Sequence, residues 1–116
     1  MLFLCYPKCT TCQKAEKWLK EHKVKFEIRD IKENNPSASE IRKWYKQSGL
    51  PLKKFFNTSG LKYKSLNLKN KLPAMSEKDQ IALLASDGML VKRPILICDD
   101  KVLVGFKESE YSRLIK

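Results

Sequence analysis

The sequence contains few of the residues from which metal centres and hydrolytic sites are usually built. Its 116 residues include one histidine, His22, and four cysteines. A structural zinc ion takes four ligands, commonly from two Cys pairs, whereas only Cys9 and Cys12 form a CxxC pattern. There is no Gly-rich phosphate loop, no Ser/His/Asp arrangement and no readable pair of carboxylates. A metal site is therefore a weak alternative, and the Cys pair is the main chemical candidate.

Long apolar runs are also absent. A membrane-spanning helix needs roughly 18 or more apolar residues in succession, and no run approaches that length. The opening residues, MLFLCYPKC, have no basic region, and their apolar run is too short for a signal peptide. We expect a cytoplasmic protein that does not contact a membrane. Stable disulfides are rare in the cytosol, so a Cys pair there is more often catalytic, redox-sensing or metal-binding than structural.

Acidic residues are missing from one long segment, residues 41–75. This segment holds nine of the 24 Lys and Arg residues and no Asp or Glu, in a chain of net charge +11. One interpretation is a solubilising surface. The other is attraction of an anionic partner, such as an acidic protein face, a nucleic acid or a small anion. We expect no direct reading of nucleic acid.

Hydrophobic periodicity predicts a βαβ unit at the start of a single domain over residues 1–116. Residues 2–6 form a short apolar run that ends at a proline, and residues 10–22 have an apolar face at helical spacing. Residues 24–30 alternate between apolar and charged side chains, which predicts a second strand. Two strands joined by a helix are expected to be parallel.

A helical insertion is predicted at about 36–90. It opens with a capping box at Ser37 and Glu40 and has a helix-stopping glycine at Gly88. A hairpin over residues 95–104 and a closing helix over 107–115, with its apolar side chains (Tyr111, Leu114 and Ile115) facing inward, complete the chain. Without the insertion, this is the order of a thioredoxin-like α/β domain with a mixed four-stranded sheet.

The positions of Cys9 and Cys12 favour a redox couple. Cys9 precedes the first helix, where unpaired N–H groups and the helix dipole favour a thiolate, and Lys8 and Lys14 add nearby positive charge. Cys12 is one turn further in and is expected to be shielded. It can then attack a mixed disulfide on Cys9 and release the product. Two inert, packed cysteines remain an alternative at this point.

The other chemically suggestive side chains have simpler interpretations. Cys5 and Cys98 lie in predicted strands and are expected to be small buried hydrophobes. His22 is expected to be a helix-end or core residue rather than a ligand. The aromatic residues at helical positions are expected to pack in the core; they are Trp18, Trp44, Phe55 and Phe56.

Four stretches together resemble the arsenate reductase (ArsC)/Spx family. They are YPKCTTCQKAEKWL, FFNTSGLKYKSLNL, LLASDGMLVKRPILI and VLVGFKESEY, and they occur in family order over nearly the whole chain. The chain is most similar to the short, arsenate reductase-like members. The resemblance implies a thioredoxin-like fold with a helical insertion before a final hairpin and helix, in agreement with the periodicity.

The resemblance also implies roles for individual residues. Cys9 matches the family's nucleophile and Cys12 matches the second cysteine of its redox-switch members. Arg93 matches an arginine near the thiol, and Pro94 matches a proline expected in cis beside it. Arsenate reductases of this type surround the oxyanion with three arginines, and by our matching the other two positions hold Asn57 and Gly105. We therefore expect poor arsenate binding.

Two functions follow from these patterns. The first is a thiol–disulfide oxidoreductase that uses Cys9 and Cys12, has no bound cofactor, takes electrons from glutathione or thioredoxin, and acts on a thiol or disulfide substrate or a redox partner protein. The second is a redox-switched regulator of the Spx type that binds RNA polymerase or another acidic partner through segment 41–75. Spx members are usually longer at the C-terminus, and the chain ends at Lys116, which argues against full equivalence.

Overall fold

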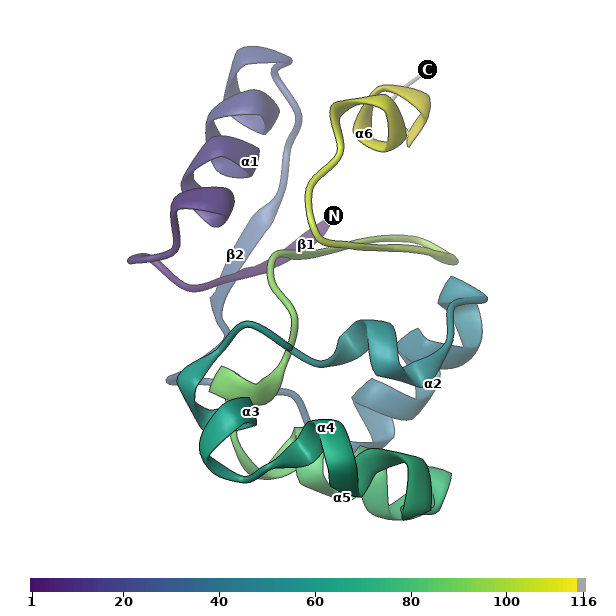
Figure 1. Ribbon diagram of the computed structural model, residues 1–116. Coiled ribbons are helices and arrows are strands. Elements are labelled where there is room, and N and C mark those ends of the chain that lie inside the picture. The colour runs from purple at the N-terminus through teal and green to yellow at the C-terminus, as the bar shows by residue number, and fades with distance from the viewer. Residues whose placement is uncertain (115–116) are drawn as a thin grey trace.

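The computed structural model describes residues 1–114, and these form a four-stranded mixed sheet covered on both faces by helices (Figure 1). The strands are β1 (Leu2–Cys5), β2 (Glu27–Asp30), β3 (Ile95–Cys98) and β4 (Lys101–Val104). Their order across the sheet is β2-β1-β3-β4. The β1–β2 pair is parallel, as the βαβ pattern predicted, and the β1–β3 and β3–β4 pairs are antiparallel.

Two helices lie together on one face of the sheet, and the helical insertion lies on the other (Figure 1). The first pair is α1 (Thr10–Glu21) and α6 (Glu108–Leu114). The α-helices of the insertion are α2 (Ala38–Ser48), α3 (Leu61–Ser65), α4 (Leu68–Lys71) and α5 (Glu77–Ser86). Its short 3₁₀ turns are η1 (Leu52–Phe55), η2 (Leu72–Ala74) and η3 (Gly88–Leu90).

The alternation of side chains along β1 divides the core into two layers. Phe3 and Cys5 pack in the same apolar cluster as Trp18 of α1 and Tyr111 of α6. Leu4, between them, packs in the larger cluster with the side chains of the insertion. Because successive side chains in a strand point to opposite faces, one buried strand supports both layers. The four predicted core aromatics are buried in these clusters, and they are Trp18, Trp44, Phe55 and Phe56.

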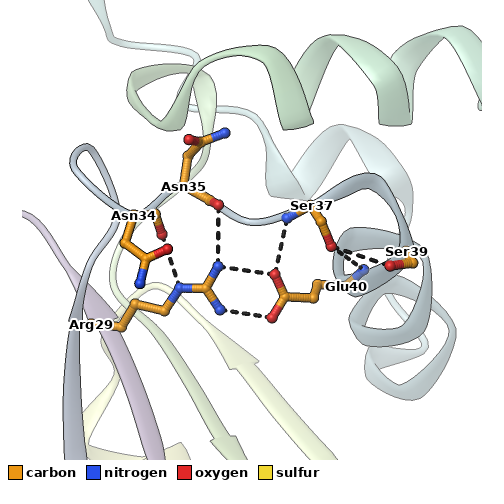
Figure 2. A network of polar contacts seen from close by, with 6 residues as sticks. All are labelled: Arg29, Asn34, Asn35, Ser37, Ser39 and Glu40. Atoms are coloured by element: carbon orange, nitrogen blue, oxygen red, sulfur yellow. Dashed lines mark hydrogen bonds and ion pairs between the residues drawn. The ribbon is translucent and has the colours of Figure 1, made fainter.

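The insertion is tied to the sheet by a polar network centred on Arg29 of β2 (Figure 2). Arg29 Nη1 and Nη2 donate to the two carboxylate oxygens of Glu40 at 2.7 and 2.9 Å. Arg29 Nε and Nη2 also donate to the carbonyl oxygens of Asn34 and Asn35, at 2.9 and 3.1 Å. Glu40 completes the predicted capping box of α2, because its carboxylate accepts from the Ser37 N–H at 3.0 Å and its own N–H donates to Ser37 Oγ at 3.2 Å.

Two boundaries differ from the sequence prediction. The second strand begins at Glu27 instead of residue 24, because Lys23 has a left-handed φ of 56° and the Val24 N–H bonds back to the carbonyl of Leu19 at 3.0 Å. Gly88 does not stop α5, which ends at Ser86. Gly88 instead starts η3, at a point where a β-carbon would collide with the carbonyl oxygen of Ile31.

The closing helix is α6, and Tyr111 is buried on its inner face as predicted. Leu114 is partly buried against the same cluster. The predicted inward position of Ile115 lies outside the described residues. None of the described helices is both long and apolar enough to cross a membrane.

Candidate functional site

Cys9 lies at the N-terminal cap of α1, in the loop between β1 and the helix. Its backbone is extended (φ −83°, ψ 122°) and its carbonyl accepts the first helical hydrogen bond, from the Gln13 N–H at 3.0 Å. The loop is held by the Cys9 N–H, which donates to the Tyr6 carbonyl at 2.9 Å, and by the Gln13 side chain, which donates to the Pro7 carbonyl at 2.9 Å. The Cys9 side chain is half-buried and faces a cavity.

Cys12 lies one turn further along α1 and is only 2% exposed. It packs in the cluster formed by α1, α6 and the sheet. Its Sγ accepts a hydrogen bond from the Tyr6 N–H at 3.4 Å. The structure thus brings the two predicted redox cysteines together at the start of one helix, with Cys9 accessible and Cys12 enclosed.

The surroundings of the two thiols shift their pKa values in opposite directions. Burial raises the pKa of Cys9, but the backbone N–H and thiol of Cys12 and the guanidinium of Arg93 lower it, and the net pKa lies below the ordinary value of 9.0. The Cys9 thiol nevertheless makes no capping hydrogen bond of standard geometry within α1. Burial, followed by the neighbouring Cys9 and Cys5, raises the pKa of Cys12 to about 12, although the Tyr6 N–H opposes this rise.

Arg93, and not Lys8 or Lys14, supplies the side-chain charge that lowers the pKa of Cys9. The Arg93–Pro94 peptide bond is cis, the geometry that the family resemblance implied. The guanidinium carbon of Arg93 lies 5.1 Å from the centre of the Tyr6 ring, a cation–π contact. One hydrogen bond to the Met89 carbonyl, at 3.5 Å, is long, and the buried Nε has no partner among the described residues.

The loops around Cys9 are joined by backbone pairing between the insertion and the segment before β3. Phe56 and Val91 form an isolated antiparallel bridge. On either side of it the Asn57 N–H donates to the Leu90 carbonyl at 2.8 Å, and the Lys92 N–H donates to the Phe55 carbonyl at 2.7 Å. This pairing holds Asn57, Lys92 and Arg93 beside the start of α1.

A cavity of about 590 Å³ opens at this junction and is lined by Cys9, Arg93 and Asn57. Lys62 and Asp87 also line it and form an ion pair at 3.6 Å. Sequence reasoning identified Cys9, Arg93 and Asn57 but missed Thr11, Lys92 and Met89, which also line the cavity. The position of Lys92, directly before the Arg-Pro pair, is the signal that would have found it.

The two positions without the expected arginines differ in their surroundings. Asn57 lines the Cys9 cavity, so an uncharged amide takes the place of a guanidinium there. Gly105 is buried, has a left-handed φ of 82°, and does not line this cavity. Its N–H donates to the Pro94 carbonyl at 2.8 Å.

The remaining cysteines and the histidine lie outside the site. Cys5 is buried in β1, as predicted, and burial raises its pKa to about 11. Cys98 is only partly buried, because β3 ends at the exposed turn at Asp99, so the prediction of a buried Cys98 was wrong. His22 caps the end of α1, where its ring stacks on Trp18 and its Nδ1 lies 2.9 Å from the Trp18 carbonyl.

Over residues 1–114, no three His, Cys, Asp or Glu side chains gather as metal ligands. The described site brings together two thiols, the start of α1 and three basic side chains, Arg93, Lys62 and Lys92. The sheet order, the βαβ and ββα units and the paired cysteines at the start of α1 define a thioredoxin-like α/β protein. A cis proline follows Arg93 beside that site.

Comparisons with known proteins agree with this class and narrow it. The family model described as ArsC family matches residues 4–114, and the chain belongs to that family. It is 56% identical to the Bacillus subtilis protein YusI over 111 residues, which cover 96% of this chain and 94% of that protein. A crystal structure of an ArsC family related protein from Bacteroides fragilis has a TM-score of 0.95 and 55% identity, covering 97% of this chain and 95% of that one.

Regulators are also among the relatives. The chain is 28% identical to the global transcriptional regulator Spx of Staphylococcus epidermidis over 109 residues, which cover 94% of this chain and 82% of that protein. The relatives of this chain thus include a protein named for regulation alongside the ArsC-like proteins.

Proposed function

We propose that the protein is a cytosolic thiol–disulfide oxidoreductase in which Cys9 attacks and Cys12 resolves. The observation that carries the proposal is the contrast between the two sulfur atoms on one helix turn. Cys9 faces a cavity beside Arg93, whereas Cys12 is 2% exposed and held by the Tyr6 N–H. A pair with one accessible and one enclosed thiol is suited to sequential attack and release.

In the first step, the Cys9 thiolate attacks one sulfur atom of a substrate disulfide, R–S–S–R. A Cys9–S–S–R mixed disulfide forms and one R–S⁻ thiolate leaves. The thiolate is favoured by the start of α1 and by the Arg93 guanidinium, which also lower the pKa of Cys9. A Cys9 side chain that is already a thiolate attacks without the help of a separate base.

In the second step, the Cys12 sulfur attacks Cys9, expels the second R–S⁻ and leaves a Cys9–Cys12 disulfide. Burial keeps Cys12 protonated beforehand, and in this step its proton passes to the departing R–S⁻, which leaves as R–SH. The substrate gains two electrons and the protein loses two. Two molecules of a monothiol such as glutathione, which become its disulfide, or the dithiol of one thioredoxin would return the two electrons and reset the pair.

Arg93 and Pro94 have positioning roles in this proposal. Arg93 holds its positive charge against the Cys9 sulfur and over the Tyr6 ring. Pro94 presents a carbonyl that accepts from the Gly105 N–H at 2.8 Å, so the loop carrying Arg93 is tied to the end of β4. Arg93 thereby lines the same cavity as Cys9, and Pro94 holds the loop that carries it.

A mixed-disulfide trap tests the proposal and identifies the substrate. The Cys12→Ser variant should accumulate a covalent adduct on Cys9 when it is incubated with native cytosol, because the resolving sulfur is missing. The matched control, Cys9→Ser with Cys12 intact, should capture nothing. In the unmodified protein, mild oxidation should give one intramolecular Cys9–Cys12 disulfide that dithiothreitol reverses. Oxidation of Cys9 to a stable sulfinic acid with Cys12 untouched would contradict the assignment.

A second candidate function is a redox-switched regulator, which the likeness to Spx favours. In that case the basic segment 41–75 would bind RNA polymerase or another acidic partner, and the Cys9–Cys12 disulfide would control binding. The segment's lysines are mostly exposed, including Lys43, Lys46 and Lys69. A stoichiometric partner that co-purifies with the reduced protein and is lost on oxidation would favour this function over turnover of a disulfide substrate.

A further inference from the structure

A second cavity lies directly beside the Cys9 cavity. Its volume is about 640 Å³, and the two cavities share Thr11 and Lys92 as lining residues. Thr11 belongs to the first turn of α1, and Lys92 belongs to the segment paired with Phe55. A molecule whose sulfur atom reaches Cys9 can therefore extend past these two side chains into the second cavity.

The second cavity is strongly basic. It is lined by Lys53, Lys54, Lys92 and Lys107, with Glu110 as its single carboxylate. Within the part of the chain that the structure describes, none of these four lysines forms an ion pair, whereas Lys62 of the Cys9 cavity is paired with Asp87. Unpaired lysines that converge on one concave surface attract anions.

The absence of a side chain at Gly105 keeps this cavity open. A β-carbon added there would lie 3.7 Å from Cε of Lys92, so a longer side chain would project toward the space in front of that lysine. The φ of 82° at Gly105 also disfavours any residue with a β-carbon. The family resemblance matches Gly105 to an oxyanion-binding arginine. Here that position has no side chain, and lysines line the cavity around it.

We propose that the second cavity binds the anionic part of a small disulfide while its sulfur atom reacts with Cys9. The substrate class is a low-molecular-weight disulfide that carries carboxylate or phosphate groups. A cavity of this size accommodates such a group, and Phe106 in its wall, which is only partly buried, can contact the substrate's carbon skeleton. The inference deepens the proposed oxidoreductase function and rests on it. The electron balance is that of the two steps above, with one disulfide reduced to two thiols and Cys9–Cys12 oxidised.

The test is a single-turnover reaction of the reduced protein with two disulfide probes of different charge. The anionic probe is 5,5′-dithiobis(2-nitrobenzoate), which has a carboxylate on each ring, and the neutral probe is 2,2′-dithiodipyridine. Reaction of other cysteines is subtracted with the Cys9→Ser variant. Because each variant is compared with the unmodified protein for the same probe, the different intrinsic reactivities of the probes cancel.

The test variant is Lys53→Gln/Lys54→Gln/Lys107→Gln, which removes three cavity lysines and leaves Lys92 in place. The control variant, Lys43→Gln/Lys46→Gln/Lys69→Gln, removes the same charge from exposed lysines that line neither cavity. We expect the test variant to react about tenfold more slowly than the unmodified protein with the anionic probe. Its rate with the neutral probe should stay within about twofold of the unmodified protein's rate. The control variant should change the anionic-probe rate by less than threefold.

Equal slowing by both triple variants would mean that the overall charge attracts the probe, and would overturn the inference. An unchanged anionic-probe rate in the test variant would also overturn it. If the unmodified protein reduces neither probe through Cys9, the proposed oxidoreductase function itself fails. If Cys9 reduces the neutral probe but the cavity lysines do not raise the rate with the anionic probe, the proposed anion site is wrong and the oxidoreductase function stands.

Competition in the unmodified protein provides a second measurement that does not depend on the variants' folding. Succinate and pyrophosphate, neither of which has a thiol, should slow the anionic probe and leave the neutral probe unaffected. Stronger competition by succinate would assign carboxylates to the cavity, and stronger competition by pyrophosphate would assign phosphates. Absence of competition by both at millimolar concentration would overturn the inference.

Discussion

Two arginines, Arg29 in β2 and Arg93 just before β3, use their guanidinium groups in opposite ways. Arg29 donates to two backbone carbonyls and to both oxygens of Glu40, at 2.7 to 3.1 Å, so every nitrogen has a partner (Figure 2). Arg93 makes one long bond of 3.5 Å, rests over the Tyr6 ring and leaves its buried Nε unpaired among the described residues.

From this contrast we expect Arg29 to stabilise the fold and Arg93 to act on the Cys9 thiolate. A guanidinium with all donors occupied stabilises one arrangement of chain segments. A guanidinium with free donors beside a thiol keeps its charge available to the sulfur and to an incoming anion, at a cost in folding stability. The predictions below test the contrast, from the largest expected effect to the smallest.

The largest expected effect is on arsenate binding, because Arg93 is present at one of three positions where the family resemblance implies arginines. We expect weak or no arsenate reductase activity with a glutaredoxin/glutathione supply. Each missing charge-assisted contact costs roughly 1.5–3 kcal/mol, so the amide of Asn57 and the absent side chain of Gly105 together lower arsenate binding on the order of 10²- to 10⁴-fold. The assay is arsenate-dependent NADPH oxidation, with Cys9→Ser as the control. Robust Cys9-dependent turnover would show that lysines such as Lys62 compensate.

The next effect concerns the two cysteines that Arg93 helps to distinguish. The pKa of Cys9 lies below 9.0 and that of Cys12 is about 12. A larger fraction of Cys9 than of Cys12 is therefore ionised at pH 7, and burial of Cys12 adds a steric barrier. Limited iodoacetamide treatment followed by peptide mapping should find Cys9 labelled first. Equal labelling of Cys9 and Cys12 would remove the distinction between attacking and resolving thiols.

A crossed pair of substitutions tests the two arginines directly. Arg93→Met should slow alkylation of Cys9 at pH 7 by about tenfold, because a half-buried charge-assisted contact of about 1.5 kcal/mol is lost from the thiolate. The rate should recover at higher pH, since only the thiolate fraction is reduced. Arg29→Met should leave the rate and its pH profile unchanged. A comparable loss in both variants would mean that Arg93 acts through the fold.

Sequence patterns were sufficient to predict the element order of this fold and the position of Cys9 and Cys12 at the start of the first helix. The CxxC before a periodic helix, the apolar alternation and the Ser37–Glu40 box depend on residues close together in the chain, and all three have the expected structures. The start of β2 was misplaced because Lys23 takes a left-handed conformation that its residue type does not indicate.

The walls of the site were harder to predict, because they depend on long-range pairing. The bridge between Phe56 and Val91 brings Lys92 to the start of α1 and beside Gly105, and no local pattern encodes that contact. The role of Arg29 was also not predictable from local sequence. The alternating pattern indicates only a polar residue of an amphipathic strand, whereas in the structure Arg29 is the centre of the network with Glu40.

Removing Arg29, whose guanidinium nitrogens all have partners, should lower stability without changing the reactivity of Cys9. We expect Arg29→Met to lower the free energy of unfolding by about 1–2 kcal/mol, the low end for a bidentate charge-assisted pair, because the Glu40 side chain is 36% exposed and solvent screens it. Urea unfolding measures the loss. Arg93→Met, whose guanidinium has few partners to lose, should lower the free energy of unfolding by less. A larger loss for Arg93→Met would reverse the comparison.

The smallest effect is the acid sensitivity of the Arg29–Glu40 pair. The hydrogen bonds from Arg29, aided by the Ser37 N–H and opposed by burial, lower the pKa of Glu40 from 4.5 to about 2. A carboxyl group with a lowered folded-state pKa stabilises the fold fully above its unfolded-state pKa, and the contribution is lost as pH falls through the folded-state value. The stabilisation from Glu40 should therefore be complete above about pH 5 and decline between pH 4.5 and 2.

Glu40→Gln isolates this charge, because glutamine still fits the capping box with Ser37. The difference in unfolding free energy between the unmodified protein and Glu40→Gln should be roughly 1 kcal/mol at pH 7, after allowance for solvent screening, and should shrink toward zero at pH 2.5. In an Arg29→Met background, the same substitution should cost little at either pH. Urea unfolding of the four proteins at both pH values is the measurement. A cost that stays constant with pH would mean that the charge of Glu40 is not what stabilises the fold, and a pH-dependent cost that persists without Arg29 would assign the effect to another cation.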